Sequence, residues 1–239
     1  MTVRLLSHEE DGRGWPVLAW VAGPGWRMVS TAVVGGGIGE RSWWLNAHVR
    51  SDYRRMDPEA HLLEIATALE LPGDDGVGML TAADVTRWRS ATDSGVEATA
   101  TVGLGVPVRA AVPQHEADRE AAALVGTVNV LVRVPVALGD AALVNAVVTA
   151  TEAKTQALVE AGIPGTGTSS DAVCIACPAP TGNARGEPYG GPRSTWGARV
   201  ARAVHAAVAA GTDDWLEQHP LGDRHRLWPP AAPHGGRPS

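Results

Sequence analysis

Four hydroxyl residues and one carboxylate are crowded into the stretch GTGTSSD, residues 165–171. The last three hydroxyls belong to Thr168, Ser169 and Ser170, which directly precede Asp171. A hydroxyl held beside a carboxylate is an arrangement that activates a nucleophile or binds a polar group. The same residue types also form tight turns in which the side chains only satisfy nearby backbone amides. These residues alone favour neither interpretation.

A single CxxC pair, Cys174 and Cys177, follows this stretch. A structural zinc site of this type requires a second pair, and the chain has only two cysteines. A thioredoxin-like pair opens a helix, whereas AVCIA (172–176) is typical of a strand. We therefore predict that both thiols are buried packing residues.

Two of the eight histidines stand where acid–base chemistry is plausible. His48 follows Asn46 by two residues in an expected strand, so their side chains should share one face. His61 lies in the first turn of a helix expected after Asp57, where the helix dipole favours a neutral ring. For each, a half-buried ring with a hydrogen bond is the alternative. Neither HxH nor HExxH occurs, so histidine spacing indicates no metal site.

A polar stripe follows one face of a long helix expected from Asp140 to Gly162. Its members are spaced as i, i+4, i+7 and i+11: Asn145, Thr149, Glu152 and Gln156. Lys154, the only lysine in the chain, lies about 200° around the helix from Glu152. One regular helix therefore cannot direct both side chains into one small site. A lone lysine among arginines indicates a position that requires an ammonium group.

The glycine-rich segment GGGIGE (35–40) differs from a dinucleotide-binding fingerprint, because Glu40 occupies the sixth position and a strand is expected to follow. We interpret it as a turn in which backbone closely approaches a neighbour. A flat ligand packed on Gly36 and Gly37 is the alternative.

The bulk composition excludes several classes of protein. The chain has 239 residues and a net charge of −6, with no basic run, which argues against a nucleic-acid partner. No apolar run is long enough for a membrane span, and the first residues lack the apolar core of a signal peptide. We expect a cytoplasmic protein, and the composition leaves open assembly into a homo-oligomer.

The periodicity of apolar residues predicts an α/β or α+β fold, a single-domain layered sandwich with mixed sheets flanked by helices. A short helix is also expected near Thr81. Beyond residue 211 the periodicity ends, so we expect one domain over 1–211 and a partly disordered tail over 212–239 that is rich in Pro, His and Arg. The predicted strands are 28–35, 42–49, 77–80, 96–104, 126–136 and 172–176, and the predicted helices are 57–69, 140–162 and 194–210.

Several of these stretches together resemble the adenosylcobinamide amidohydrolases of the CbiZ type, over roughly residues 28 to 211. Their order and spacing carry the resemblance, since none is specific by itself. In chain order they are VVGGGIGERSWWLN, DPEAHL, GVGMLTAADV, ATVGLG, GTVNVLVRVPV, DAALVNAVVTATEAKTQAL, GTGTSSDAV and GEPYGGPRSTWGARVARAVHAAV.

The resemblance implies hydrolysis of the amide between the aminopropanol arm and the corrin ring of adenosylcobinamide, with no cofactor required. A weaker similarity links GVGMLTAAD and GTGTSSDAV to self-cleaving aminopeptidases with α/β/β/α layers. Thr81 would then stand where those enzymes have their exposed amino-terminal residue, but Leu80-Thr81 carries no cleavage signal, so we predict no self-cleavage.

Within the matching stretches, chemical reasoning selects two sets of candidate residues. The candidate catalytic residues are His61, Thr81, Asp84, Glu152, Thr168 and Asp171. The candidate substrate-binding residues are Gly36, Gly37, Asn46, Asn145, Thr149, Ser169 and Arg193. We expect Asp171 at the mouth of a pocket formed by its own turn, the Asn145–Glu152 face and the turn at 35–39.

Two other functions remain as hypotheses at this point. A corrinoid carrier would keep the fold without the chemistry. A metal-dependent hydrolase of another amide would need at least three His, Asp or Glu side chains that converge on one point, and the sequence shows no spacing that demands this.

Overall fold

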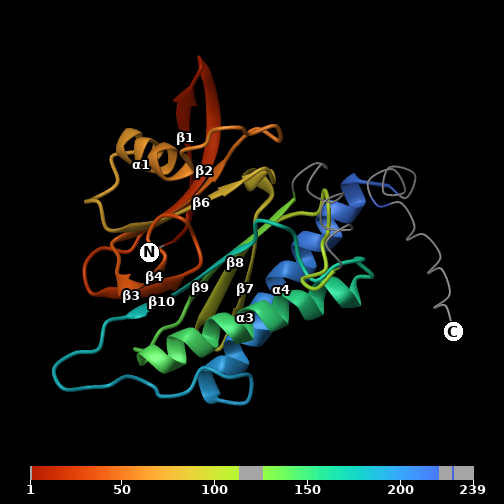
Figure 1. Cartoon of the computed structure of the whole chain (residues 1–239). Coiled ribbons are helices and arrows are strands. Elements are labelled where there is room, and N and C mark those ends of the chain that lie inside the picture. Colours follow the sequence, from red (N-terminus) through yellow and green to blue (C-terminus); the bar gives the residue numbers. More distant parts are fainter. Residues whose placement is uncertain (1, 113–125, 221–227, 229–239) are drawn as a thin grey trace, which may run out of the picture.

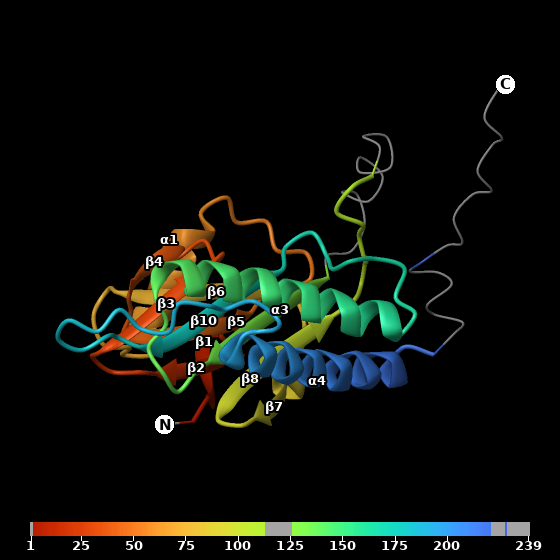
Figure 2. The ribbon, with the colours of Figure 1, turned by 90° about the horizontal axis from the view of Figure 1, so that it is seen from below.

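The computed structural model of the protein describes residues 2–112, 126–220 and 228 (Figure 1). Two β-sheets lie face to face, with helices on both outer faces. Helix α1 (Pro58–Ala68) covers the smaller sheet, and α3 (Asp140–Glu160) and α4 (Thr195–Gln218) lie side by side on the larger sheet (Figure 2). None of the helices in the described residues is long and apolar enough to cross a membrane.

The smaller sheet has four strands in the order β1-β2-β5-β6. Its pairs are antiparallel except β5 with β6, which run parallel and are joined through α1. The strands are β1 (Arg4–Glu10), β2 (Arg13–Val21), β5 (Trp43–His48) and β6 (Gly76–Thr81).

The larger sheet has six strands in the order β4-β3-β10-β9-β8-β7. Only β9 and β10 run parallel, and α3 forms the crossover between them. The strands are β3 (Trp26–Ser30), β4 (Gly37–Glu40), β7 (Arg89–Asp93), β8 (Val96–Gly103), β9 (Thr127–Arg133) and β10 (Ala172–Pro178).

Three apolar layers hold these elements together. Strand β5 illustrates how alternation builds them, since Trp43 and Leu45 pack toward α1 while Trp44 packs between the sheets. A third layer joins the larger sheet to α3 and α4 through residues such as Val130 and Val204. The result is an α/β/β/α sandwich, which confirms the predicted layered fold with mixed sheets.

One helix differs clearly from its predicted limits. Helix α3 begins at Asp140, as predicted, with Gly139 as its N-cap. Helix α4 extends to Gln218 rather than to residue 210, because the larger sheet holds its last turns. Gly211 packs so closely on Val102 that a Cβ would lie 2.6 Å from that side chain, and Trp215 is buried. The expected boundary at 211 therefore falls inside a helix, and most of the remaining tail lies outside the described residues.

Both cysteines are buried free thiols on β10, as predicted. Cys174 lies between the sheets, with its sulfur 3.8 Å from that of Met28, whereas Cys177 packs under the helices. Burial raises the pKa of both thiols, which favours the neutral form. They act as small apolar side chains.

Replacing Cys174 and Cys177 together with Ala should lower the free energy of unfolding by about 1–3 kcal/mol, because each change removes a small buried side chain. Urea unfolding followed by circular dichroism measures this. The transition should stay cooperative. A double variant that cannot fold would show that the thiols do more than fill space.

Candidate functional site

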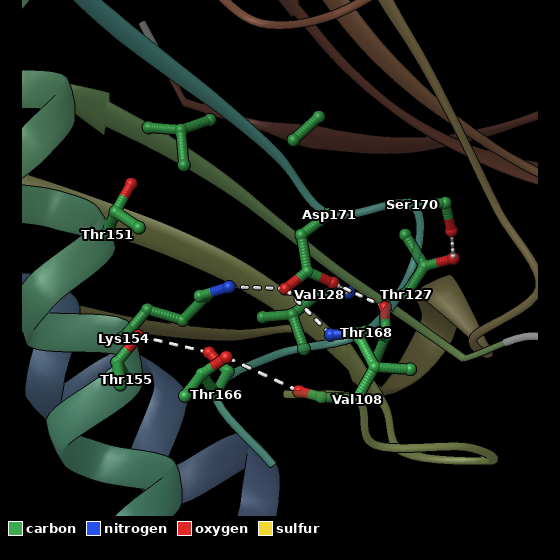
Figure 3. Close-up of polar contacts among 12 residues, drawn as sticks. Val108, Thr127, Val128, Thr151, Lys154, Thr155, Thr166, Thr168, Ser170 and Asp171 are labelled. Carbon is green, nitrogen blue, oxygen red and sulfur yellow. Dashed lines mark hydrogen bonds and ion pairs between the residues drawn. The ribbon is translucent and has the colours of Figure 1, made fainter. Parts of the chain in front are cut away.

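The Asp171 carboxylate, just before β10, accepts four hydrogen bonds (Figure 3). Its Oδ1 accepts from the Val128 amide at 2.8 Å and from the Thr168 hydroxyl. Its Oδ2 accepts from the Thr168 amide at 3.1 Å and from the Lys154 ammonium. These groups come from β9, α3 and the 165–171 turn, so one carboxylate fixes three parts of the chain relative to one another.

Lys154 and Asp171 form a buried ion pair. Their side chains are 7% and 11% exposed, respectively. Gly167 makes the approach possible, because a Cβ there would lie 2.3 Å from Asp171 Oδ2 and 2.5 Å from Lys154 Nζ. The turn therefore requires glycine at this position for steric reasons rather than for its backbone conformation.

The turn is held from two further sides. Backbone hydrogen bonds of 2.8 Å join Val108 to the turn, from the Val108 amide to the Gly167 carbonyl and from the Thr166 amide to the Val108 carbonyl. The Thr155 hydroxyl on α3 donates to the Thr166 carbonyl at 3.0 Å. Asp171 and Thr168 are thus placed on a fixed loop rather than on a free one.

A row of hydroxyls continues from the turn toward β9. The hydroxyls of Thr127 and Ser170 lie 2.8 Å apart, and Ser170 also donates to the Gly126 carbonyl at 3.2 Å. Ser169 and Ser170 are exposed, whereas Thr127 and Thr168 are buried. The outer side of the turn therefore presents hydroxyl groups to solvent, with the carboxylate directly beneath them.

Two asparagine amides bridge the sheets below this turn. Asn129 Nδ2 donates to Asn46 Oδ1 and to the Leu80 carbonyl, both at 2.9 Å, and Asn129 Oδ1 accepts from the Ala172 amide. Asn46 in turn donates to the Thr101 hydroxyl at 2.9 Å. Both side chains are 1% exposed. Asn46, selected from the sequence as a substrate contact, instead lies in this buried network, which ties the end of β6 to the start of β10.

The Thr81–Asp84 segment continues from β6 on the other side of the network. Thr81 is buried and its hydroxyl accepts from the Ala83 amide at 3.0 Å. Asp84 caps the short 3-10 helix η1 (Val85–Arg87), where it accepts from the Thr86 amide. His48 pairs with Thr81 across β5 and β6, and burial lowers the pKa of its ring. These side chains lie near the same end of the sandwich as Asp171 but not in contact with it.

The polar stripe on α3 does not face Asp171, so the expected pocket with an Asn145–Glu152 face is wrong. Thr149 is buried and donates to the Gly190 carbonyl at 2.8 Å, and Asn145 lies beside Gly191. Glu152 is exposed. The reason is the rotation between Glu152 and Lys154, since the helix turns its Lys154 face toward the loop.

His61 lies in the outer layer of the sandwich. Its ring is buried between α1 and the smaller sheet, stacked on Tyr53. Its Nδ1 lies 3.0 Å from the Tyr53 hydroxyl and its Nε2 lies 3.3 Å from Glu10. Asp171 and its hydrogen-bond partners Val128, Lys154 and Thr168 are called the Asp171 group here. The structure separates His61 from this group by the thickness of the smaller sheet.

The remaining candidates are also spread over the molecule. Gly36 packs against the Ala32 carbonyl, 2.6 Å from where its Cβ would be, as expected for a turn with close backbone approach. Gly37 has a positive φ of 75° and open space beside it. Arg193 is exposed and donates to the adjacent Pro192 carbonyl.

Sequence reasoning missed three residues that the structure brings together. Lys154 was noticed as the only lysine but had no expected partner. Thr127 and Asn129 lie in strand β9, whose other residues before Arg133 are apolar, and this break in the pattern was the available signal. Among the described residues, no three His, Cys, Asp or Glu side chains converge as metal ligands would.

Comparison with known proteins identifies relatives over most of the chain. A family model described as adenosylcobinamide amidohydrolase matches residues 2–220. A protein named adenosylcobinamide amidohydrolase from Halobacterium salinarum is 36% identical over 203 residues, covering 81% of this chain and 83% of that protein. A protein of the same name from Methanosarcina mazei is 35% identical over 94 residues, covering 37% of this chain and 47% of that protein.

Proposed function

Because this chain belongs to the adenosylcobinamide amidohydrolase family, we propose that it hydrolyses the amide between the aminopropanol arm and the corrin ring of adenosylcobinamide. The products are adenosylcobyric acid and 1-amino-2-propanol. The match of the family model to residues 2–220 is the observation that carries this proposal. It also confirms the resemblance found in the sequence.

We propose that the Asp171 group carries the proton transfers of this reaction. Amide hydrolysis needs a group that takes a proton from the nucleophile and a group that protonates the leaving amine. The Thr168 hydroxyl donates to Asp171, so the carboxylate stands where a base for that hydroxyl would stand. Asp171 would take the proton either from the Thr168 hydroxyl or from a water molecule bound beside it, and the protonated carboxyl would then give that proton to the leaving amine. If Thr168 is the nucleophile, water must afterwards hydrolyse the ester that it forms.

Lys154 supports this arrangement through charge. A carboxylate with so little exposure is costly without a cation beside it. The ammonium on Oδ2 supplies that cation while Oδ1 faces the Thr168 hydroxyl. We assign Lys154 as a positioning residue, since it acts through Asp171.

We propose further that the reaction needs no nucleotide or nicotinamide cofactor and takes place in the cytoplasm on a small-molecule substrate. The glycine-rich segment at 35–40 supports the first point, because it leads into strand β4 rather than into the helix of a dinucleotide-binding loop. The net charge of −6 supports a small-molecule substrate over a nucleic acid.

Purified protein incubated with adenosylcobinamide alone should release 1-amino-2-propanol and adenosylcobyric acid in equal amounts, because hydrolysis consumes only water. Liquid chromatography with mass spectrometry quantifies both products. Heat-denatured protein is the control for spontaneous hydrolysis. If native protein binds the corrinoid and forms neither product, the protein is a corrinoid carrier.

A further inference from the structure

A cavity of about 290 Å³ lies where β8 ends. The turn after β6 forms one side of it, the end of β8 forms the floor, and the last turns of α4 form the other side. Its lining includes Asp84 from the turn, Gly103 and Gly105 from the floor, and Trp215 and Gln218 from the helix. None of these residues has a role in the Asp171 group described above.

The cavity adjoins the Asp171 group through Gly126. A Cβ on Gly126 would lie 2.6 Å from the Gly103 carbonyl oxygen and 2.9 Å from the Gly105 amide, both in residues of the cavity floor. The same Cβ would lie 3.1 Å from the Thr168 methyl group. Gly126 is therefore packed between the cavity floor and the side chain of Thr168, whose hydroxyl donates to Asp171. A ligand with its reacting bond at Thr168 would extend over this cavity.

The lining suits a neutral polar group. Arg87 pairs with Asp214 at 2.7 Å and Arg89 pairs with the same carboxylate, so two arginines offset the two carboxylates at this cavity, Asp214 and Asp84. The two N–H groups of Gln218 donate to Asp214, so Gln218 offers its amide oxygen as an acceptor, and the Ser51 hydroxyl offers both a donor and an acceptor. A carboxamide needs this mixture, because its N–H groups require acceptors and its carbonyl requires a donor. A ligand with a strong charge of either sign would meet one unfavourable partner here.

Trp215, which is buried, and His219 form an aromatic side of the cavity. Trp215 stacks on His219 with ring centroids 3.9 Å apart, and Trp228 stacks on Trp215 at 5.3 Å. The Trp228 indole donates to the Leu104 and Gly105 carbonyls, at 3.1 and 3.3 Å, so this stack is anchored to the cavity floor. An aromatic wall beside hydrogen-bonding groups is typical of small-molecule sites.

We infer that this cavity holds carboxamide groups on the rim of the corrin ring while the scissile amide lies at Thr168 and Asp171. A corrinoid is a flat macrocycle whose rim carries amide side chains, so one of them reaches the Asp171 group as its neighbours enter the cavity. The inference rests on the proposed substrate. It assigns to Ser51 and Gln218 a part in substrate affinity rather than in chemistry.

A second cavity supplies a matched control. It also has a volume of about 290 Å³, and it is lined by Trp20, Trp26, Glu97 and Arg133. Glu97 lies near the start of β8, whereas Gly103 is its last residue. Six residue steps along the strand place them about 20 Å apart. The same ligand therefore has no reason to depend on Glu97.

The test uses Ser51→Trp, which fills the cavity, and Gln218→Ala, which removes a hydrogen-bonding group. Both residues are exposed, so both variants should fold, and circular dichroism checks this. Glu97→Gln is the control variant. Isothermal titration calorimetry gives the Kd for adenosylcobyric acid, which keeps the ring but lacks the scissile amide, and for adenosylcobinamide in proteins that also carry the slow-turnover change Asp171→Asn. Steady-state kinetics separate KM from kcat.

We expect Ser51→Trp to raise both Kd values about tenfold or more, and Gln218→Ala to raise them about three- to tenfold, the loss of one hydrogen bond. KM should rise with them while kcat stays within twofold. Unchanged Kd in both variants, or equal weakening in Glu97→Gln, overturns the inference. Binding that depends on Ser51 without any hydrolysis would overturn the proposed function and keep the cavity. Hydrolysis with an unchanged KM in both variants would keep the proposed function and overturn the inference about the cavity.

Discussion

Asp171→Asn should lower turnover of adenosylcobinamide about a hundredfold or more, because it removes the proton acceptor beside the Thr168 hydroxyl. The change also disturbs the structure. The carboxylate accepts hydrogen bonds on both oxygens, whereas an Asn side chain has one acceptor oxygen and an NH2 group with two donors. At least one N–H of the Asn would therefore face another donor. We therefore expect the free energy of unfolding to fall by about 3 kcal/mol as well. Steady-state kinetics and urea unfolding measure the two effects.

Two further variants separate chemistry from folding. Asp93→Asn removes a carboxylate that pairs with Arg202 at the surface, and turnover should stay within twofold. The double variant Lys154→Met/Asp171→Asn removes both buried charges and should recover part of the lost stability. If turnover recovers with it, Asp171 is needed only for the structure of the turn.

Lys154→Met should lower the free energy of unfolding by about 3–5 kcal/mol, the largest stability effect that we expect. Met fills a similar volume but leaves the Asp171 carboxylate buried without its cation. Turnover should also fall, because the carboxylate is then no longer held against Thr168. Urea unfolding at constant ionic strength measures the loss of stability.

The matched control for this change is Arg202→Met, which breaks the surface ion pair with Asp93. Exposed pairs contribute little, so its unfolding curve should lie close to that of the parent. Lys154→Arg keeps the charge but brings a larger planar group to a space limited by Gly167, so it should recover only part of the stability. A Lys154→Met variant as stable as the parent would contradict a structural role for the pair.

Most of the apolar or β-branched strands were predictable from the sequence, including the edge strand β6, but the β1–β2 hairpin and the edge strands β4 and β7 were not. Strands β5, β8, β9 and β10 were expected from continuous apolar or β-branched runs. The β1–β2 hairpin was missed although Asp11-Gly12 is a strong turn signal, with both φ angles positive at 54° and 70°. Its first strand is charged and mostly exposed, so it carries no clear apolar alternation. Strand β7, at the edge of the larger sheet, has the same character.

Helical geometry predicted only part of the candidate site. Helical spacing shows that Glu152 and Lys154 point in opposite directions, but it cannot show which of them faces the turn. That choice depends on which side of α3 packs on the larger sheet. Ala150, Ala153 and Ala157 pack into the core, and Lys154 lies at the margin of this face. Alanine carries little hydrophobic signal, so the sequence pattern drew attention to the polar stripe instead.

Every side chain and amide that contacts Asp171 belongs to a single crossover, the segment from β9 through α3 to the start of β10. The walls of the neighbouring cavity come from elsewhere, from the turn after β6, the end of β8 and the last turns of α4. The proposed reaction and the proposed recognition therefore depend on separate stretches of the chain. On this proposal, substitutions in the turn after β6, at the end of β8 or in the last turns of α4 would change which corrinoid is accepted, while the crossover that holds Asp171 stays unchanged.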